Sequence, residues 1–196
     1  MIITPNQIQA FETPGAAWRW ACEMINRFGQ KVVTEDGQTT KEIRNLVLQV
    51  QNPDLGWPIS GSNWDIPALE VYYQDQIIGT ENPTGFSYIY GQRIAPHLAP
   101  LIAKLKAQPE SRRAVISLWH DSDYDIQHPP CWMVLEFLIR GDQLHLTAFI
   151  RSNDMLQAWP ANAYGLSKLL SNVASEVGCE TGSLTTISAS AHIYIE

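Results

Sequence analysis

A cysteine that follows two prolines, and a later stretch that ends in Arg-Ser-Asn-Asp, carry the residue types best suited to chemistry in this chain. Cys131 opens the apolar stretch CWMVLEFLIR, and Arg151 closes the next one, QLHLTAFIR. Gly141-Asp142 joins the two as a hairpin, so we expect the thiol and the guanidinium to lie side by side. The prolines place the thiol at a strand start or bulge. A neighbouring cation favours the thiolate, which is the nucleophilic form of cysteine.

A purely structural explanation competes with this one. A cysteine at the end of a strand is often a small buried hydrophobic side chain, and the local sequence alone favours that explanation for Cys131.

The charge pattern limits the ligands that the chain can bind. A net charge of -7 argues against a nucleic-acid surface, which needs a basic stripe. Against this acidic background Arg112-Arg113 and Arg151-Ser152 stand out as sites for a single phosphate. The histidines are scattered and no HExxH or paired Cys/His spacing exists, so we expect no metal site.

Six short motifs follow one another in the order and spacing of the thymidylate synthase family, which this sequence resembles. They are PPC, RSND, PAN and AHIY in the second half of the chain, with SRR at 111–113 and YGQR at 90–93 upstream. The resemblance covers roughly residues 40–195. It implies an α+β fold with a mostly antiparallel or mixed sheet packed by helices, in a single domain over residues 1–196. It also implies a homodimer that buries a face of the sheet.

The resemblance further implies one-carbon transfer to C5 of deoxyuridine monophosphate (dUMP), with methylene-tetrahydrofolate or a related reduced pterin as the donor. Cys131 would add to C6 and so make C5 nucleophilic. Glu42 would order water at O4, although Thr39 and Glu42 also fit a helix capping box. Tyr90 is the candidate for removing the C5 proton. Trp64 and Asp154 would lie beside the donor, and Asp154 would also take part in catalysis.

Other residues match the positions by which the family holds its nucleotide. Arg151 and Ser152 would bind the phosphate, and Arg112 and Arg113 would reach the same phosphate from the partner subunit. The remaining matched positions would contact the sugar and the base, and they are His192, Tyr194 and Asn162.

Asn162 carries the information about the base. A side-chain amide complements the N3–H donor and O4 acceptor of uracil, but a reversed amide would suit cytosine equally well. Family members that act on cytosine carry an aspartate at this position, so the resemblance favours uracil. A helix N-cap is the structural alternative for this asparagine.

The sequence departs from the family pattern in four places. A third phosphate-binding arginine from an early loop is not evident, and Lys31 is the only nearby cation. Trp132 stands where histidine usually follows the cysteine, ISASAH lacks the usual Gly-Gly-Asp, and the sequence stops two residues after Tyr194. Two alternatives therefore stay open. One is a 5-hydroxymethylase acting on dUMP, dCMP or CMP, and the other is a non-catalytic protein that binds pyrimidine nucleotides.

Periodicity and turn residues predict the elements that must position these side chains. Helices come first and strands later, with one long helix inserted, which is typical of an α+β protein. The predicted helices cover 14–29, 39–53, 62–74, 94–109 and 160–178, and the predicted strands cover 112–119, 131–140, 143–151 and 183–195. Ser62 and Asp65 fit a second capping box, at the start of the third helix.

The sequence also predicts a cytoplasmic protein. Its longest apolar runs are far shorter than the roughly 20 residues that cross a bilayer, and residues 1–15 carry no basic region before an apolar stretch. Three widely separated cysteines suit a reducing compartment better than a disulfide framework.

Overall fold

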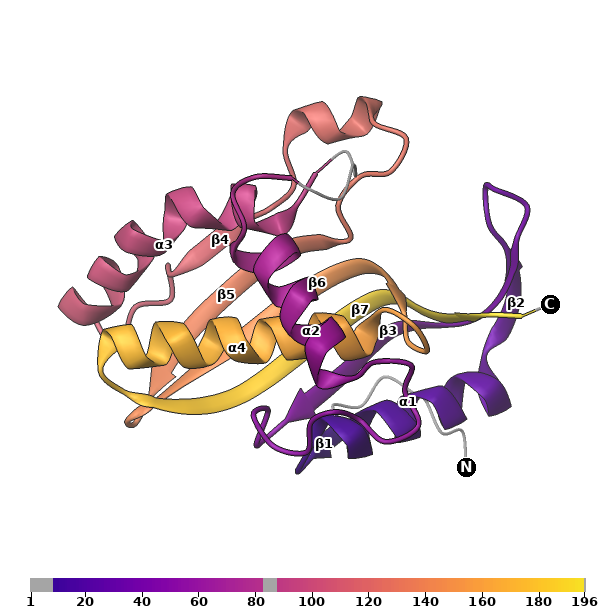
Figure 1. Ribbon diagram of the computed structural model, residues 1–196, viewed down its shortest axis with the longest axis horizontal. Helices are drawn as coiled ribbons and strands as arrows, with labels where there is room; N and C mark the ends of the chain where they lie inside the picture. The colour runs from indigo at the N-terminus through magenta and orange to yellow at the C-terminus, as the bar shows by residue number, and fades with distance from the viewer. Residues whose placement is uncertain (1–8, 83–87, 196) are drawn as a thin grey trace.

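A mixed β-sheet with helices on one face forms the framework of the molecule (Figure 1). The computed structural model describes residues 9–82 and 88–195, so part of the N-terminal segment considered above lies outside the described residues. The strand order is β1-β3-β7-β6-β5-β4, and β2 pairs with β3 as well. The strands are β1 (Gln9–Phe11), β2 (Gln30–Val33), β3 (Thr39–Val50), β4 (Val115–Ser117), β5 (Trp132–Arg140), β6 (Gln143–Asp154) and β7 (Glu180–Tyr194).

Four α-helices of the described residues accompany this sheet, which confirms the predicted α+β class. Figure 1 shows α1, α2 and α4 crossing the same face, while α3 lies beside β4 and β5. A π-helix continues α2 without a break. The bounds are α1 (Pro14–Phe28), α2 (Ile66–Tyr72), the π-helix η1 (Tyr73–Ile78), α3 (Tyr90–Ala107), the 3-10 helix η2 (Asp121–Asp125) and α4 (Trp159–Val177).

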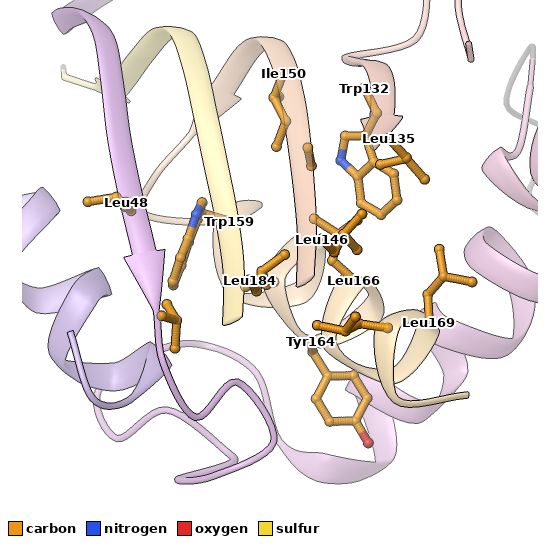
Figure 2. Close-up of a cluster of buried hydrophobic side chains, with 14 of the residues drawn as sticks. Leu48, Trp132, Leu135, Leu146, Ile150, Trp159, Tyr164, Leu166, Leu169 and Leu184 are labelled. Carbon is orange, nitrogen blue, oxygen red and sulfur yellow. The ribbon is translucent and has the colours of Figure 1, made fainter. Parts of the chain in front are cut away.

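Side chains alternate between the two faces of the central strands, because successive residues of a strand point to opposite sides. In β6, Leu144, Leu146, Ala148 and Ile150 are buried, while the residues between them are half-buried or exposed. The buried set packs with α4 into the main core, where Trp132 and Trp159 are the largest fully buried side chains (Figure 2). One face of the sheet is therefore covered by helices, and no helix of the described residues lies on the other.

The helix predicted over 39–53 is wrong, because this segment is strand β3. Its apolar residues at 43, 46, 47 and 50 repeat at helical spacing, which is what misled the prediction. In the structure β3 lies between β1 and β7 and also pairs with β2. Sheet partners thus satisfy its backbone groups on both sides, and tertiary pairing outweighs the local period. The capping box of Thr39 and Glu42 does not exist.

The second predicted capping box is also corrected. Asp65, not Ser62, is the N-cap of α2, and its Oδ1 accepts a hydrogen bond from the Ala68 amide at 2.8 Å. The Ser62 hydroxyl instead donates to the Ile59 carbonyl at 2.9 Å. The N-cap of α2 therefore lies one turn later in the chain than the sequence predicted.

Other elements agree with the predictions within a few residues. The hairpin between β5 and β6 turns at Gly141, whose φ of 63° favours glycine, and α4 ends at Gly178 with φ 90°. The short strands β1 and β2 were not predicted. Among the residues that the structure describes, no helix is both long and apolar enough to span a bilayer.

Candidate active site

A cavity of about 1680 Å³ opens where the ends of β6 and β7 meet the start of β5 and the helices α2 and η1. The tip of the β2–β3 hairpin also lines it. Most of the residues singled out in the sequence border this space, although they come from distant parts of the chain. They are Trp64, Tyr90, Cys131, Arg151, Ser152, Asp154, Asn162, His192 and Tyr194.

Cys131 and Arg151 lie side by side, as the hairpin predicted. The Arg151 amide donates to the Cys131 carbonyl at 2.9 Å. Its guanidinium turns back on the two prolines, donating from Nε to the Pro130 carbonyl at 2.9 Å and from Nη2 to the Pro129 carbonyl at 2.7 Å. The strand register shifts between Trp132 and residue 134, so a bulge follows the cysteine directly. The remaining guanidinium N–H groups stay available for a ligand.

The electrostatics of the thiol are a balance of two opposing effects. Burial raises the pKa of Cys131 above its ordinary value, and the Arg151 charge opposes this rise only in part. The thiol therefore stays protonated near neutral pH in the absence of a ligand. It lies at the wall of a cavity, however, and not inside packed hydrocarbon.

Tyr90 packs against Trp132, the residue that stands where histidine usually follows the cysteine. The Trp132 ring stacks on Tyr90 with 4.1 Å between centroids, and the Trp132 amide donates to the Tyr90 hydroxyl at 3.4 Å. The Tyr88 ring packs edge-on against Tyr90 at 5.4 Å. Burial raises the pKa of Tyr90 well above its usual value, so the phenol stays protonated. Tyr88 also lines the cavity, and sequence reasoning missed it.

Gly91, the glycine of the Tyr-Gly motif, is required for a steric reason. A Cβ on Gly91 would lie 2.0 Å from the carbonyl oxygen of Gly79 at the end of η1. Only glycine lets α3 begin this close to η1, which places Tyr90 beside the cavity.

Parallel pairing of β6 with β7 brings together the acid and the histidine. Asp154 lies opposite His192, and the His192 ring meets Tyr194 edge-on at 5.2 Å between centroids. Burial lowers the pKa of His192, while the Asp154 charge partly restores it. Asp154 Oδ1 accepts hydrogen bonds from the amides of Leu156 and Gln157, at 2.9 and 3.1 Å. This carboxylate is thus fixed at the turn into α4.

Asn162 lies in the first turn of α4 and reaches the cavity while only 7% exposed. Its Oδ1 accepts from the Tyr72 hydroxyl at 2.8 Å, and its Nδ2 donates to Asn153 Oδ1 at 3.3 Å. It is not the N-cap, because Ala158 holds that position. Sequence reasoning missed Tyr72 and Asn153, and only the position of Asn153 inside RSND could have drawn attention to it.

Trp64 forms an apolar wall on the α2 side. Its Nε1 donates to the Gln157 carbonyl at 2.7 Å, and its ring meets Tyr72 at 5.8 Å between centroids. Both contacts fix the face of the indole that borders the cavity.

Three predicted residues do not line the cavity. Glu42 belongs to β3 and not to a helix, and its Oε2 accepts from the Ser190 hydroxyl at 2.5 Å. It pairs across the strands with His192, which places it next to the site. Arg112 and Arg113 are exposed just before β4. Within residues 9–82 and 88–195, no group of three His, Cys, Asp or Glu side chains could hold a metal ion.

Comparison with known proteins decides the family. The family model described as thymidylate synthase matches residues 26–196. The chain belongs to the thymidylate synthase family. The resemblance read from the sequence is therefore confirmed, and the matched range spans Cys131, Arg151 and Asn162.

Similar proteins come from archaea and carry the name "Putative thymidylate synthase". The Methanosarcina barkeri protein is 38% identical over 196 residues, covering 96% of this chain and 90% of its own. The Methanosarcina mazei protein is 38% identical over 185 residues, covering 91% and 85%. The Methanothermobacter marburgensis protein is 34% identical over 200 residues, covering 90% and 88%. These thymidylate synthase relatives therefore match the chain over nearly its whole length.

Proposed function

We propose that this protein transfers a one-carbon unit to C5 of dUMP through a covalent adduct between Cys131 and C6, giving thymidylate. The observation that carries the proposal is a thiol at the wall of a cavity, beside a guanidinium, with a half-satisfied amide bordering the same space. A nucleotide brings complementary groups to all three, namely an electron-poor ring carbon, a phosphate and a base edge.

The residues of the cavity suggest how the nucleotide is held. Arg151 and Ser152 bind the phosphate, His192 and Tyr194 bind the 3'-hydroxyl, and Asn162 binds the base. A dianionic phosphate next to Arg151 suits the planar guanidinium fork. His192 stays neutral because burial lowers its pKa, so it can both donate to and accept from a hydroxyl.

The chemical step uses the Cys131 sulfur as a temporary substituent. The thiol loses its proton, the S–C6 bond forms, and the C5=C6 electrons move into an enolate on O4 that attacks the one-carbon unit through C5. The C5 proton then leaves to water held at the Tyr90 hydroxyl. The bond between the carbon unit and the donor nitrogen breaks, which leaves an exocyclic methylene on C5. A hydride from the donor would convert this methylene to methyl while the C5=C6 bond re-forms and expels the thiolate. Glu42, beside His192, is proposed to order water on the O4 side.

The second substrate fits next to the nucleotide. A cavity of about 1680 Å³ exceeds the usual 300–1,000 Å³ of a single small-molecule site, which leaves room for a reduced pterin. Methylene-tetrahydrofolate, or a related pterin, supplies the carbon unit and the hydride. Trp64 offers a flat apolar face for its ring, and Asp154 offers a fixed carboxylate.

A homodimer is part of the proposal. The face of the sheet that no helix covers carries Phe149, which is 37% exposed, and the edge strand carries Val115, which is 46% exposed. Burying such residues against a second copy is favourable, since apolar area leaves water. Arg112 and Arg113 would then reach the partner's cavity, and the enzyme would work in the cytoplasm.

The decisive experiment weighs the nucleotide product. The protein is incubated with dUMP and methylene-tetrahydrofolate, and a gain of a methyl group supports the proposal. A hydroxymethyl group would instead identify a 5-hydroxymethylase, and bound but unchanged nucleotide would identify a binding protein. With 5-fluoro-dUMP the wild type should form a covalent adduct and Cys131→Ser should not. An adduct that persists in Cys131→Ser would refute the nucleophile.

A further inference from the structure

The amide of Asn162 is one link in a buried row of hydrogen bonds that leads away from the cavity. The Tyr72 hydroxyl donates to Asn162 Oδ1 at 2.8 Å. Asn162 Nδ2 donates to Asn153 Oδ1 at 3.3 Å, and Asn153 Nδ2 donates to Ser188 Oγ at 3.0 Å. Asn153 and Ser188 are each 1% exposed. Water therefore cannot replace a partner that one of these groups loses.

All three bonds of the row point in the same direction, from Tyr72 toward Ser188. An amide by itself can present its oxygen or its nitrogen to either side. Reversing Asn162 alone would place its nitrogen against the Tyr72 donor and its oxygen against the Asn153 oxygen. Like groups would then face each other in a buried place, which is costly. The orientation of Asn162 is thus set by its neighbours and not by Asn162 itself.

Tyr72 is the end of the row that borders the cavity. Burial raises the pKa of its hydroxyl far above the ordinary value, so it keeps its proton and remains a donor. Its ring is fixed against Trp64. A reversed row would require this hydroxyl to accept from Asn162 and to find another acceptor for its own proton.

We propose that Tyr72 and Asn153 are positioning residues that hold the Asn162 amide in one orientation, and that this orientation selects uracil over cytosine nucleotides. The inference rests on the proposed function, which brings the C4 edge of a pyrimidine to Asn162. The amide keeps one oxygen lone pair and one N–H for a ligand. Uracil offers a donor at N3 and an acceptor at O4, and cytosine offers the reverse.

The base cannot turn over to suit the amide. Cys131 holds C6 and Arg151 holds the phosphate, so only one edge of the ring can face Asn162. An amide with a fixed orientation then pairs with one base, while the other base places donor against donor and acceptor against acceptor. Such a mismatch of buried polar groups discriminates strongly between the two nucleotides.

The test compares two tyrosines that are adjacent in the chain. Tyr72→Phe removes the hydroxyl that donates to Asn162. Tyr73→Phe is the matched control, because the Tyr73 hydroxyl also bonds an asparagine, accepting from Asn172 at 2.6 Å, but does not line the cavity. Dissociation constants for dUMP and dCMP are measured by calorimetry for each protein. We expect the preference for dUMP to fall about tenfold in Tyr72→Phe and to stay unchanged in Tyr73→Phe.

For a second variant, Asn153→Asp, we expect the preference for dUMP to be kept. Asn153→Asp keeps an acceptor toward Asn162 Nδ2 and cannot donate, so the amide keeps its orientation and the preference for dUMP is retained. Circular dichroism of both variants checks that they fold. Loss of the preference in Asn153→Asp would contradict the inference.

The remaining outcomes separate this inference from the proposed function. Equal weakening of both nucleotides in Tyr72→Phe, or no change, overturns the inference and leaves the proposed function standing. A wild type that prefers dCMP, with the preference lost in Tyr72→Phe, supports the positioning role and overturns the choice of uracil. A wild type that binds neither nucleotide overturns both.

Discussion

At the scale of single residues, the thiol of Cys131 is defined by what surrounds it. Burial and the Arg151 charge act on its pKa in opposite directions, and burial has the larger effect. The cysteine is therefore a thiol near neutral pH in the absence of a ligand, and under the proposed function a bound nucleotide has to help the proton leave. Arg151 also binds the carbonyls of Pro129 and Pro130, which explains why the two prolines and the arginine occur together.

The first prediction concerns the reactivity of this thiol. Without ligand, the rate at which iodoacetamide alkylates Cys131 should rise about tenfold per pH unit from pH 7 to the raised pKa, because the thiolate reacts. Arg151→Met should raise the pKa further and slow alkylation roughly three- to tenfold at pH 8. Arg151→Lys keeps a positive charge and should retain most of the rate.

Mass spectrometry of the labelled peptides assigns the rate to each cysteine. Burial raises the pKa of Cys22 to about 12, with a smaller contribution from Asp154, so Cys22 should react slowly in every variant. A rate at Cys131 that does not depend on Arg151 would show that the guanidinium does not act on the thiol.

At the scale of elements, the site depends on how closely the segments approach one another. The start of α3 touches the end of η1 through Gly91, and this contact carries Tyr90 to the cavity. The pairing of β6 with β7 likewise brings Asp154 and His192 to the cavity. Neither approach can be seen in local sequence patterns.

The second prediction tests the approach of α3 to η1. Gly91→Ala would force a Cβ to 2.0 Å from the Gly79 carbonyl oxygen, so we expect a loss of about 1–3 kcal/mol or more in the free energy of unfolding. Tyr90 should shift with the helix, and formation of thymidylate should fall. Urea denaturation and the product assay provide the two measurements.

Ala103→Gly is the control for this substitution. It exchanges the same residue types at an exposed position of the same helix, where glycine costs about 1 kcal/mol through helix propensity alone. Its activity should equal that of the wild type. Full activity in Gly91→Ala would show that the close approach does not position Tyr90.

At the scale of the whole molecule, the location of Arg112 and Arg113 raises the question of assembly. Both are exposed before β4 and neither borders the cavity of its own chain. In the proposed homodimer, the face of the sheet that no described helix covers would be the surface that brings these residues to the neighbouring site. If each active site contains residues of two subunits, two different inactive variants can restore activity when they form mixed dimers. Sites built from one subunit cannot do this.

The third prediction tests this restoration of activity in mixed dimers. Cys131→Ser and the double variant Arg112→Ala with Arg113→Ala should each be inactive or nearly so. Refolded together, they should form mixed dimers in which one site has an intact cysteine and intact arginines, which restores about a quarter of the wild-type activity. Sedimentation of the wild type should show a dimer. A mixture as inactive as its components would contradict sites shared between subunits.

The fold could be predicted from sequence where local and tertiary preferences agree. The β5–β6 hairpin has a glycine turn and two apolar strands, and α4 has a helical period and a glycine stop, so both were predicted nearly to the residue. The segment 39–50 has a helical period but forms a strand, since its neighbours β1 and β7 supply partners for its backbone. A single segment contains no information about such partners.

The sequence by itself determined the family and most of the predicted residues that border the cavity, because the order of its motifs is a property of the chain. Only the tertiary structure decided how these residues act on each other. It places Cys131 where burial outweighs the effect of the Arg151 charge on the pKa of the thiol, and it places Tyr72 and Asn153 in hydrogen bonds with the two ends of the Asn162 amide. These relations depend on distance and on exclusion of water, which arise only when distant segments pack together.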